Sequence, residues 1–95
     1  MLLPRQVFVL KSQATFRQME IVIAVAEAGS MTRAAQRLGT SKENVSLAVK
    51  RFEQNFGRQI FIREYRKIIP TSECLGVIEI LQEALDVFDR LSLLD

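Results

Sequence analysis

Apolar residues recur every three or four positions in three consecutive stretches, residues 15–28, 31–38 and 42–56. This spacing places the apolar side chains of each stretch on one side of a helix, so the pattern predicts three amphipathic helices. Thr15 and Gln18 have the spacing of a capping box at the start of the first helix. The core face predicted for that helix consists of Phe16, Met19, Val22, Ile23 and Ala26.

Short breaks that contain glycine separate these helices. Gly29 ends the first helix, and Ser30 can cap the second helix with its hydroxyl group. Gly39 ends the second helix, and Thr40 or Ser41 can cap the third. Two helices joined by so short a turn predict a helix-turn-helix arrangement.

The segment after Gly57 predicts a β-hairpin. Residues 59–63 and 67–69 are rich in β-branched and aromatic residues, and a polar turn at residues 64–66 separates them. Pro70 follows the second strand, a position that an edge strand tolerates. The two strands are therefore expected to form a small wing beside the three helices.

A last helix is predicted from a cap at Thr71 or Ser72 toward the C-terminus. Its apolar positions alternate by three and four, which is the spacing of a heptad seam, and further apolar positions flank that seam. This face is wider than one small domain needs, so we expect the helix to pack against a second copy of the chain. The residues expected at that dimer contact are Val77, Ile78, Leu81, Ala84, Leu85, Phe88 and Leu91.

Composition narrows the chemistry. The 95 residues contain 48% hydrophobic residues, enough for one domain with a real core. There is no histidine and a single cysteine, which disfavours a zinc site, a histidine-dependent nucleophile and an internal disulfide. We therefore expect that the protein is not an enzyme and binds no metal or cofactor. Cys74 is interpreted as a small buried apolar residue. The adjacent carboxylates Glu79 and Glu83 are interpreted as a solvated helix face.

The absence of disulfides fits a reducing bacterial cytoplasm, with the protein at the nucleoid when it is bound. No apolar run approaches the twenty residues of a membrane span, and the first ten residues lack the charged lead of a signal peptide. The chain offers no obvious pocket for a small-molecule ligand.

The net charge of +2 conceals an uneven distribution. Residues 15–70 hold ten lysines and arginines against five acidic residues, whereas residues 71–95 hold one arginine against six. A basic body with an acidic tail indicates that one end of the molecule faces a polyanion.

Specific sequence runs resemble the N-terminal domain of LysR-type transcriptional regulators. They are AEAGS at residues 26–30, TRAAQRL at residues 32–38 and FGRQIFIR at residues 56–63, with Thr71 opening the last helix. The resemblance implies a mainly α winged helix-turn-helix, with three helices and a two-stranded wing, followed by a long dimerisation helix. It divides the chain into an N-terminal extension at 1–14, the DNA-binding domain at 15–70 and the linker helix at 71–95.

The chain departs from the family pattern in four respects. The family usually has Ser-Gln-Pro-Ala-Leu-Ser at the recognition helix, where this chain has Ser-Lys-Glu-Asn-Val-Ser at residues 41–46, so the base-reading positions differ. Cys74 replaces a glycine that usually follows the wing. Residues 1–14 have no counterpart in a typical member. The 95-residue chain also lacks the family's large effector-binding domain. This absence is expected either of a fragment or of a protein that has no sensor domain.

The resemblance and the chemistry of side chains together predict a surface that binds double-stranded DNA. The start of the recognition helix would enter the major groove, where lysine, asparagine and glutamate can each recognise a base edge. The wing and the start of the second helix would contact phosphates. The predicted DNA-binding residues are Thr32, Arg33, Ser41, Lys42, Glu43, Asn44, Ser46, Leu47, Lys50, Arg51, Arg63, Arg66 and Lys67.

The expected function is that of a sequence-specific transcription regulator acting as a homodimer. One alternative keeps the fold but makes the chain a protein-interaction module, which pairs with another regulator through the C-terminal helix. A second alternative is the related winged-helix domain of molybdate-responsive regulators. Binding to duplex DNA by the chain alone distinguishes the regulator from the interaction module.

Overall fold

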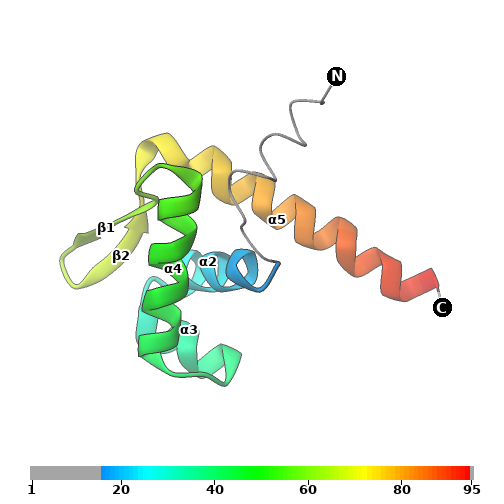
Figure 1. The fold of residues 1–95 in the computed structure, drawn as a ribbon, viewed down its shortest axis with the longest axis horizontal. Helices are drawn as coiled ribbons and strands as arrows, with labels where there is room; N and C mark the ends of the chain where they lie inside the picture. The colour runs from blue at the N-terminus through cyan, green and yellow to red at the C-terminus, as the bar shows by residue number, and fades with distance from the viewer. Residues whose placement is uncertain (1–15, 95) are drawn as a thin grey trace.

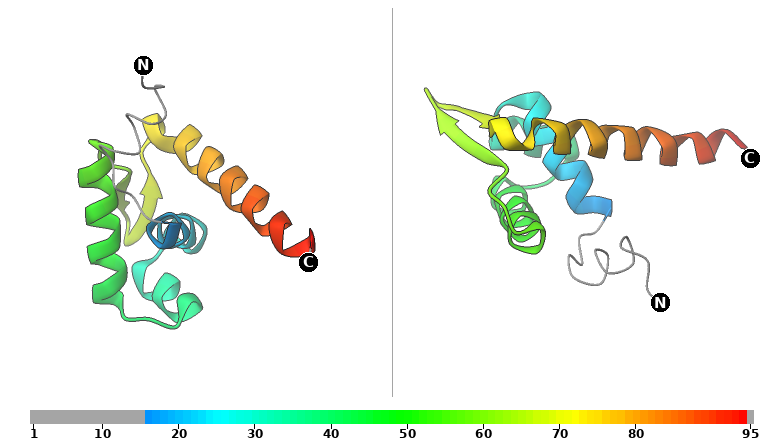
Figure 2. Two further views of the ribbon diagram at one scale, coloured as in Figure 1. Left: turned by 45° about the vertical axis from the view of Figure 1, so that its right-hand side comes forward. Right: turned by 90° about the horizontal axis from the view of Figure 1, so that it is seen from above.

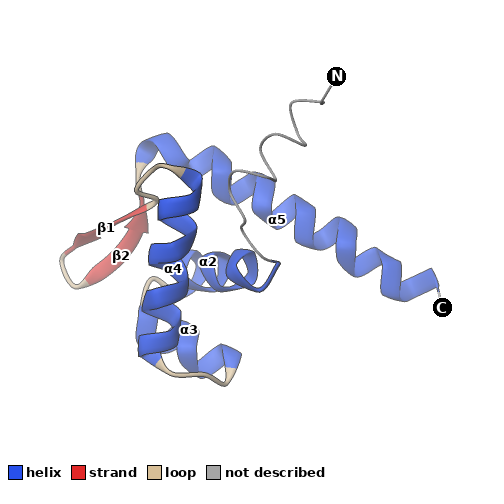
Figure 3. Cartoon of the chain, viewed as in Figure 1, coloured by secondary structure: helices blue, strands red, loops and turns tan. Residues whose placement is uncertain are grey.

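A computed structural model describes residues 16–94. The elements follow in the order α2 (Phe16–Ala28), α3 (Met31–Leu38), α4 (Lys42–Phe56), β1 (Phe61–Glu64), β2 (Lys67–Pro70) and α5 (Leu75–Arg90), as Figures 1 and 3 show. Two short 3₁₀ helices, Ser72–Cys74 and Leu91–Leu94, flank α5. The mainly α fold with a two-stranded wing is confirmed. The expectations for residues 1–14 and for the Thr15 cap lie outside the described residues.

The predicted helix starts and stops are confirmed at the helix-turn-helix. The Ser30 hydroxyl accepts a hydrogen bond from the amide of Arg33 at 3.2 Å, and the Ser41 hydroxyl accepts one from the amide of Asn44 at 3.1 Å. Gly39 ends α3 in the left-handed conformation, with φ of +67°. That conformation is accessible to glycine at little cost, which explains the sharp turn between α3 and α4.

Helix α2 lies at the centre of the domain. It contacts α3, α4, α5 and β2, and Figure 2 shows it end-on between α4 and α5. Five consecutive residues, 21–25, are therefore buried, whereas the sequence predicted a single apolar stripe. Phe16, Met19 and Ala26 of that stripe are only half-buried. The predicted stripe faces the core but is incomplete, because α2 is covered from several sides.

The wing is an antiparallel hairpin in which Phe61 pairs with Pro70 and Glu64 with Lys67. The first strand begins two residues later than predicted, because the amide of Ile60 donates to a side chain of α4 instead of to a strand. The amide of Ile68 donates to the carbonyl of Gly29 at 3.0 Å. This bond attaches β2 to the turn between α2 and α3.

The link to α5 differs from the prediction. Neither Thr71 nor Ser72 caps a helix with its side chain: the Thr71 hydroxyl donates to the carbonyl of Gln59 at 3.4 Å, and Ser72 lies within a 3₁₀ helix. Cys74 is 1% exposed, as expected of a small apolar residue, and its thiol also donates to the Gln59 carbonyl. The segment before α5 is thus held by hydrogen bonds to Gln59, just before β1, rather than by a helix cap.

Within residues 16–94, no helix combines the length and the apolar character needed to cross a membrane. The same part of the chain brings together no group of three potential metal-ligating side chains.

Candidate nucleic-acid interface

One face of α4 gathers five of the predicted DNA-binding residues. Their side chains are exposed and surround a surface depression of about 400 Å³. The opposite face of α4 is buried in the core through Val45, Val49 and Phe52. The helix is therefore held rigidly from behind. The five residues around the depression are Lys42, Glu43, Ser46, Leu47 and Lys50.

Asn44 and Ser41 take part in the turn before α4. The Asn44 amide group donates to the Thr40 hydroxyl at 3.1 Å, and the Ser41 hydroxyl caps the helix. These bonds occupy polar groups that the sequence assigned to DNA. Thr40, which the sequence analysis considered only as a cap, thus helps to fix the start of α4. Arg51 is exposed on α4, but it does not line the depression.

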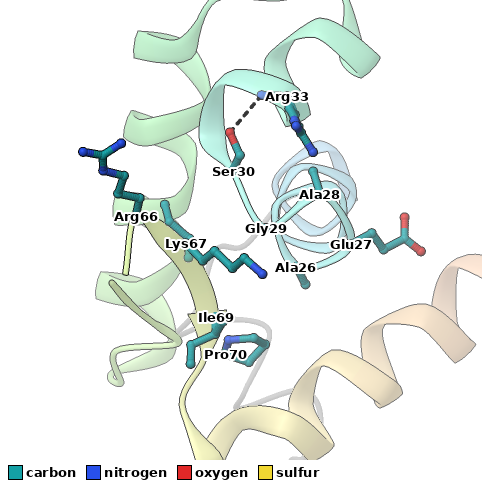
Figure 4. A pocket seen from close by; sticks show the side chains of 11 residues that line it. Ala26, Glu27, Ala28, Gly29, Ser30, Arg33, Arg66, Lys67, Ile69 and Pro70 are labelled. Atoms are coloured by element: carbon teal, nitrogen blue, oxygen red, sulfur yellow. Dashed lines mark hydrogen bonds between the residues drawn. The ribbon is translucent and has the colours of Figure 1, made fainter. Parts of the chain in front are cut away.

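A second hollow, of about 490 Å³, separates the wing from the turn between α2 and α3. Arg33, Arg66 and Lys67 line it, together with Ser30 and the backbone of Gly29 (Figure 4). Figure 4 shows the Lys67 side chain extending toward Gly29 and that of Arg66 pointing away from the hollow. The only ion pair among residues 16–94 joins Arg17 to Glu20, so these three cations are free to meet phosphates.

Thr32 is exposed in the first turn of α3. Arg63 lies on the other side of the wing, in a hollow of about 370 Å³ that also includes Val49 and Glu53 of α4. That hollow joins the recognition helix to the wing. Arg63 is the only predicted DNA-binding residue among those that line it.

Glu53 positions the wing, a role that the sequence did not predict. Its carboxylate accepts hydrogen bonds from the amides of Ile60 at 2.7 Å and Phe61 at 3.3 Å. The side chain is half-buried, so these bonds are partly shielded from water. No local sequence pattern indicates this link, since seven and eight residues separate the partners.

Two non-glycine residues of the wing turn have a left-handed backbone conformation. Tyr65 has φ of +51° and Arg66 has φ of +67°. Both central residues at positive φ match the two-residue turn that suits a twisted hairpin, a turn that usually contains asparagine and glycine. Tyr65, for which no role was predicted, is 91% exposed at the tip. Its exposed ring adds a large surface beside the wing cations.

Arg66→Gly is expected to raise stability and to lower DNA affinity. Left-handed backbone costs a non-glycine residue about 1–2 kcal/mol, and glycine's greater freedom in the unfolded chain offsets part of the gain. The melting temperature should therefore rise by about 2–6 °C, while the lost cation weakens DNA binding. Calorimetry and fluorescence anisotropy measure the two effects.

The control for this variant is Arg63→Gly, which makes the same charge change within β1. Its backbone is not in the left-handed region, so glycine should lower the melting temperature there. If both variants changed the melting temperature equally, the inferred backbone strain at Arg66 would be wrong.

Part of the predicted dimer contact already has partners within its own domain. Ile78 is buried in the core of its own domain, and Val77 and Leu81 pack against that core, because this side of α5 faces α2. Leu85 is half-buried. Ala84, Phe88 and Leu91 remain exposed, although the Phe88 ring lies 4.6 Å from that of Phe16. Ile80 and Val87, absent from the predicted set, are 65% and 57% exposed.

Four exposed apolar residues, three in α5 and one directly after it, form a seam of their own. Ile80, Ala84, Val87 and Leu91 follow one another by four, three and four positions and are all exposed. We call these four residues the outer seam. Because the helix repeats every 3.6 residues, the outer seam lies beside the stripe that covers α2. It is part of the apolar surface that the domain leaves uncovered, together with Leu75 and Phe88.

A helix-turn-helix whose second helix presents a polar face, with a cationic β-hairpin beside it, defines the winged-helix class of DNA-binding domains. The model of the family described as bacterial regulatory helix-turn-helix protein, lysR family, matches residues 16–75. The chain therefore belongs to the LysR family of bacterial transcription regulators.

Relatives and solved structures agree with this assignment. The chain is 39% identical over 75 residues to the transcriptional activator protein LysR of Escherichia coli strain K12, covering 79% of this chain and 24% of that protein. It is 33% identical over 76 residues to the Hca operon transcriptional activator HcaR of the same strain, covering 78% of this chain and 24% of that protein. The chain thus spans about a quarter of the length of these curated relatives.

Among solved structures, the CbnR DBD–DNA complex superposes with a TM-score of 0.76 and 32% identity, covering 82% of this chain and 90% of that chain. The BenM DBD in complex with catB site 1 DNA superposes with a TM-score of 0.80 at 24% identity, covering 84% of this chain and 90% of that chain, which shows the shared fold alone.

Proposed function

We propose that this chain binds duplex DNA as a homodimer and serves as the DNA-reading part of a transcription regulator. In this proposal α4 enters the major groove and reads bases, while the wing and the start of α3 contact the backbone or the minor groove. Two copies related by a two-fold axis would read a roughly palindromic site. The protein would act at the nucleoid in the bacterial cytoplasm.

The observation that carries the proposal is the presence of two different surfaces on one small domain. The exposed face of α4 offers base-reading side chains on a rigid helix, and the wing beside it offers unpaired cations. Base contacts give sequence choice, whereas phosphate contacts give affinity and orientation. The solved complex of CbnR with DNA, at 32% identity, supports the same mode of binding here.

The charge distribution supports an orientation for α5. The helix carries Glu79, Glu83, Asp86 and Asp89 and runs away from the wing (Figure 2). An acidic helix is repelled by DNA, so it is best placed on the far side of the reading surface. The outer seam on the same helix would then meet a second copy and bury its apolar side chains.

Binding to random duplex DNA across a salt series tests the proposal, with Arg66→Ala/Lys67→Ala as the variant. Each phosphate contact contributes about −0.9 to the slope of log affinity against log salt. The double variant should bind more weakly, and its slope should be shallower by up to about 1.8. Fluorescence anisotropy at several salt concentrations measures both.

The matched control is Arg17→Ala/Arg90→Ala, which removes two cations from α2 and α5 and leaves the wing unchanged. Its slope should equal that of the unmodified chain. If the unmodified chain does not bind DNA even at low salt, the proposed function is wrong. The interaction-module alternative would then account for the exposed apolar face of α5.

A further inference from the structure

Glu43 is an unusual residue for a surface that binds DNA. It is exposed in the first turn of α4 and lies in the same depression as Lys42, Ser46, Leu47 and Lys50. In the described part of the chain no cation lies within ion-pair distance of its carboxylate. No ion pair among these residues therefore neutralises the negative charge.

This carboxylate opposes nonspecific binding. DNA carries one negative charge for roughly every 1.7 Å of helix axis, and attraction to phosphates supplies most of the affinity for random sequences. An uncompensated carboxylate among Lys42, Ser46 and Lys50 weakens that attraction. A hydrogen-bond donor on the DNA that faces this carboxylate offsets the loss.

The positive end of the helix dipole also favours a carboxylate in the first turn of a helix, and Glu43 occupies that turn in α4. This gives the residue a contribution to helix stability that does not depend on DNA. A purely structural role predicts a change in melting temperature but no change in sequence preference. The two roles are therefore separable by experiment.

We propose that Glu43 determines sequence specificity by requiring the exocyclic amino group of a cytosine in the major groove, an inference that rests on the proposed function. An ionised carboxylate can only accept hydrogen bonds. Cytosine presents its N4 amino donor, whereas guanine presents two acceptors and thymine one acceptor and a methyl group. Adenine presents an amino donor beside the N7 acceptor, which repels the second carboxylate oxygen.

The neighbouring side chains fit this assignment. Lys42 and Lys50 lie on the same face and can reach guanine acceptors, and Leu47 is 45% exposed one turn from Glu43. Lysine at these positions increases the affinity for guanine. Glu43 disfavours bases that present hydrogen-bond acceptors at the base-pair step it faces. The recognition helix therefore combines attraction with selective repulsion.

The test is selection of preferred sites from random duplexes by the full 95-residue chain, its Glu43→Gln variant and a Glu79→Gln control. Glu79 is exposed on α5, away from the reading face, and its change removes the same charge. The unmodified chain should prefer cytosine at one position of each half-site by roughly 5- to 150-fold. Glutamine favours adenine, so Glu43→Gln should change that one position and leave the others unaltered.

Glu43→Gln should also bind random duplex DNA several-fold more tightly at low salt, whereas Glu79→Gln should behave as the unmodified chain. Thermal melting of all three proteins shows that each is folded. If the unmodified chain selects a site and Glu43→Gln selects the same site with the same preferences, the specificity role is wrong and the proposed function stands. If no protein binds DNA at low salt, the proposed function itself fails.

Discussion

Val87→Glu/Leu91→Glu is expected to dissociate the proposed dimer into monomers and to weaken binding to a palindromic site by about 100-fold or more. Both side chains belong to the outer seam and are more than half exposed, so the charges do not disturb the domain core. In a dimer the same positions would bury two carboxylates per chain without partners, which is strongly unfavourable. Joining two reading heads increases affinity by about 10²–10⁴-fold, and that gain is lost in the monomer.

Light scattering at micromolar concentration measures the mass, and anisotropy with a palindromic duplex measures the affinity. The matched control is Leu75→Glu, because Leu75 is 53% exposed on α5 but faces away from the outer seam. The control should remain dimeric and bind as the unmodified chain does. A dimeric double variant would exclude the outer seam as the contact, and a monomeric unmodified chain would exclude the homodimer.

Glu53→Ala is expected to lower the free energy of unfolding by about 2–4 kcal/mol. The carboxylate accepts from the amides of Ile60 and Phe61, and its removal leaves both donors without that partner in a half-buried position. For a domain of this size, each kcal/mol shifts the melting temperature by about 4–8 °C. The melting temperature should therefore fall by more than about 8 °C, which calorimetry or circular dichroism measures directly.

Glu53→Gln provides a graded comparison, because both amides donate to the same carboxylate oxygen and the amide oxygen of glutamine can replace it as an acceptor without the negative charge. Its loss of stability should be smaller than that of Glu53→Ala. Glu79→Ala removes an exposed carboxylate from α5 and should change stability by no more than about 0.5 kcal/mol. If Glu53→Ala and Glu79→Ala melted at the same temperature, the bonds from α4 to the wing would contribute nothing to stability.

The start and the end of the recognition segment were predictable because they depend on neighbouring residues. Ser30 and Ser41 each cap a helix through an amide three residues ahead, and Gly39 ends a helix with its own backbone. The polar face of α4 followed from the same periodicity that buries Val45 and Val49. Five candidate DNA-binding residues therefore lie together on one face, as the spacing predicted.

Long-range contacts were not predictable from these patterns. Glu53 resembles any other exposed acid on a helix until the chain turns back and brings two amides to it. Asn44 has the chemistry of a base-reading residue, yet its amide group bonds to Thr40 in the turn. The wing turn lacks the usual asparagine and glycine, and only the folded chain shows Tyr65 and Arg66 at positive φ.

The sequence by itself determined the order of the elements, the helix-turn-helix and the family, because helix caps, glycine stops and apolar periodicity act over a few residues. The tertiary structure alone decided which apolar stripe of α5 covers the domain and which is free. Two such stripes lie side by side on that helix, and periodicity cannot rank them. Only the packing of α2 against Ile78 and its neighbours leaves the outer seam exposed.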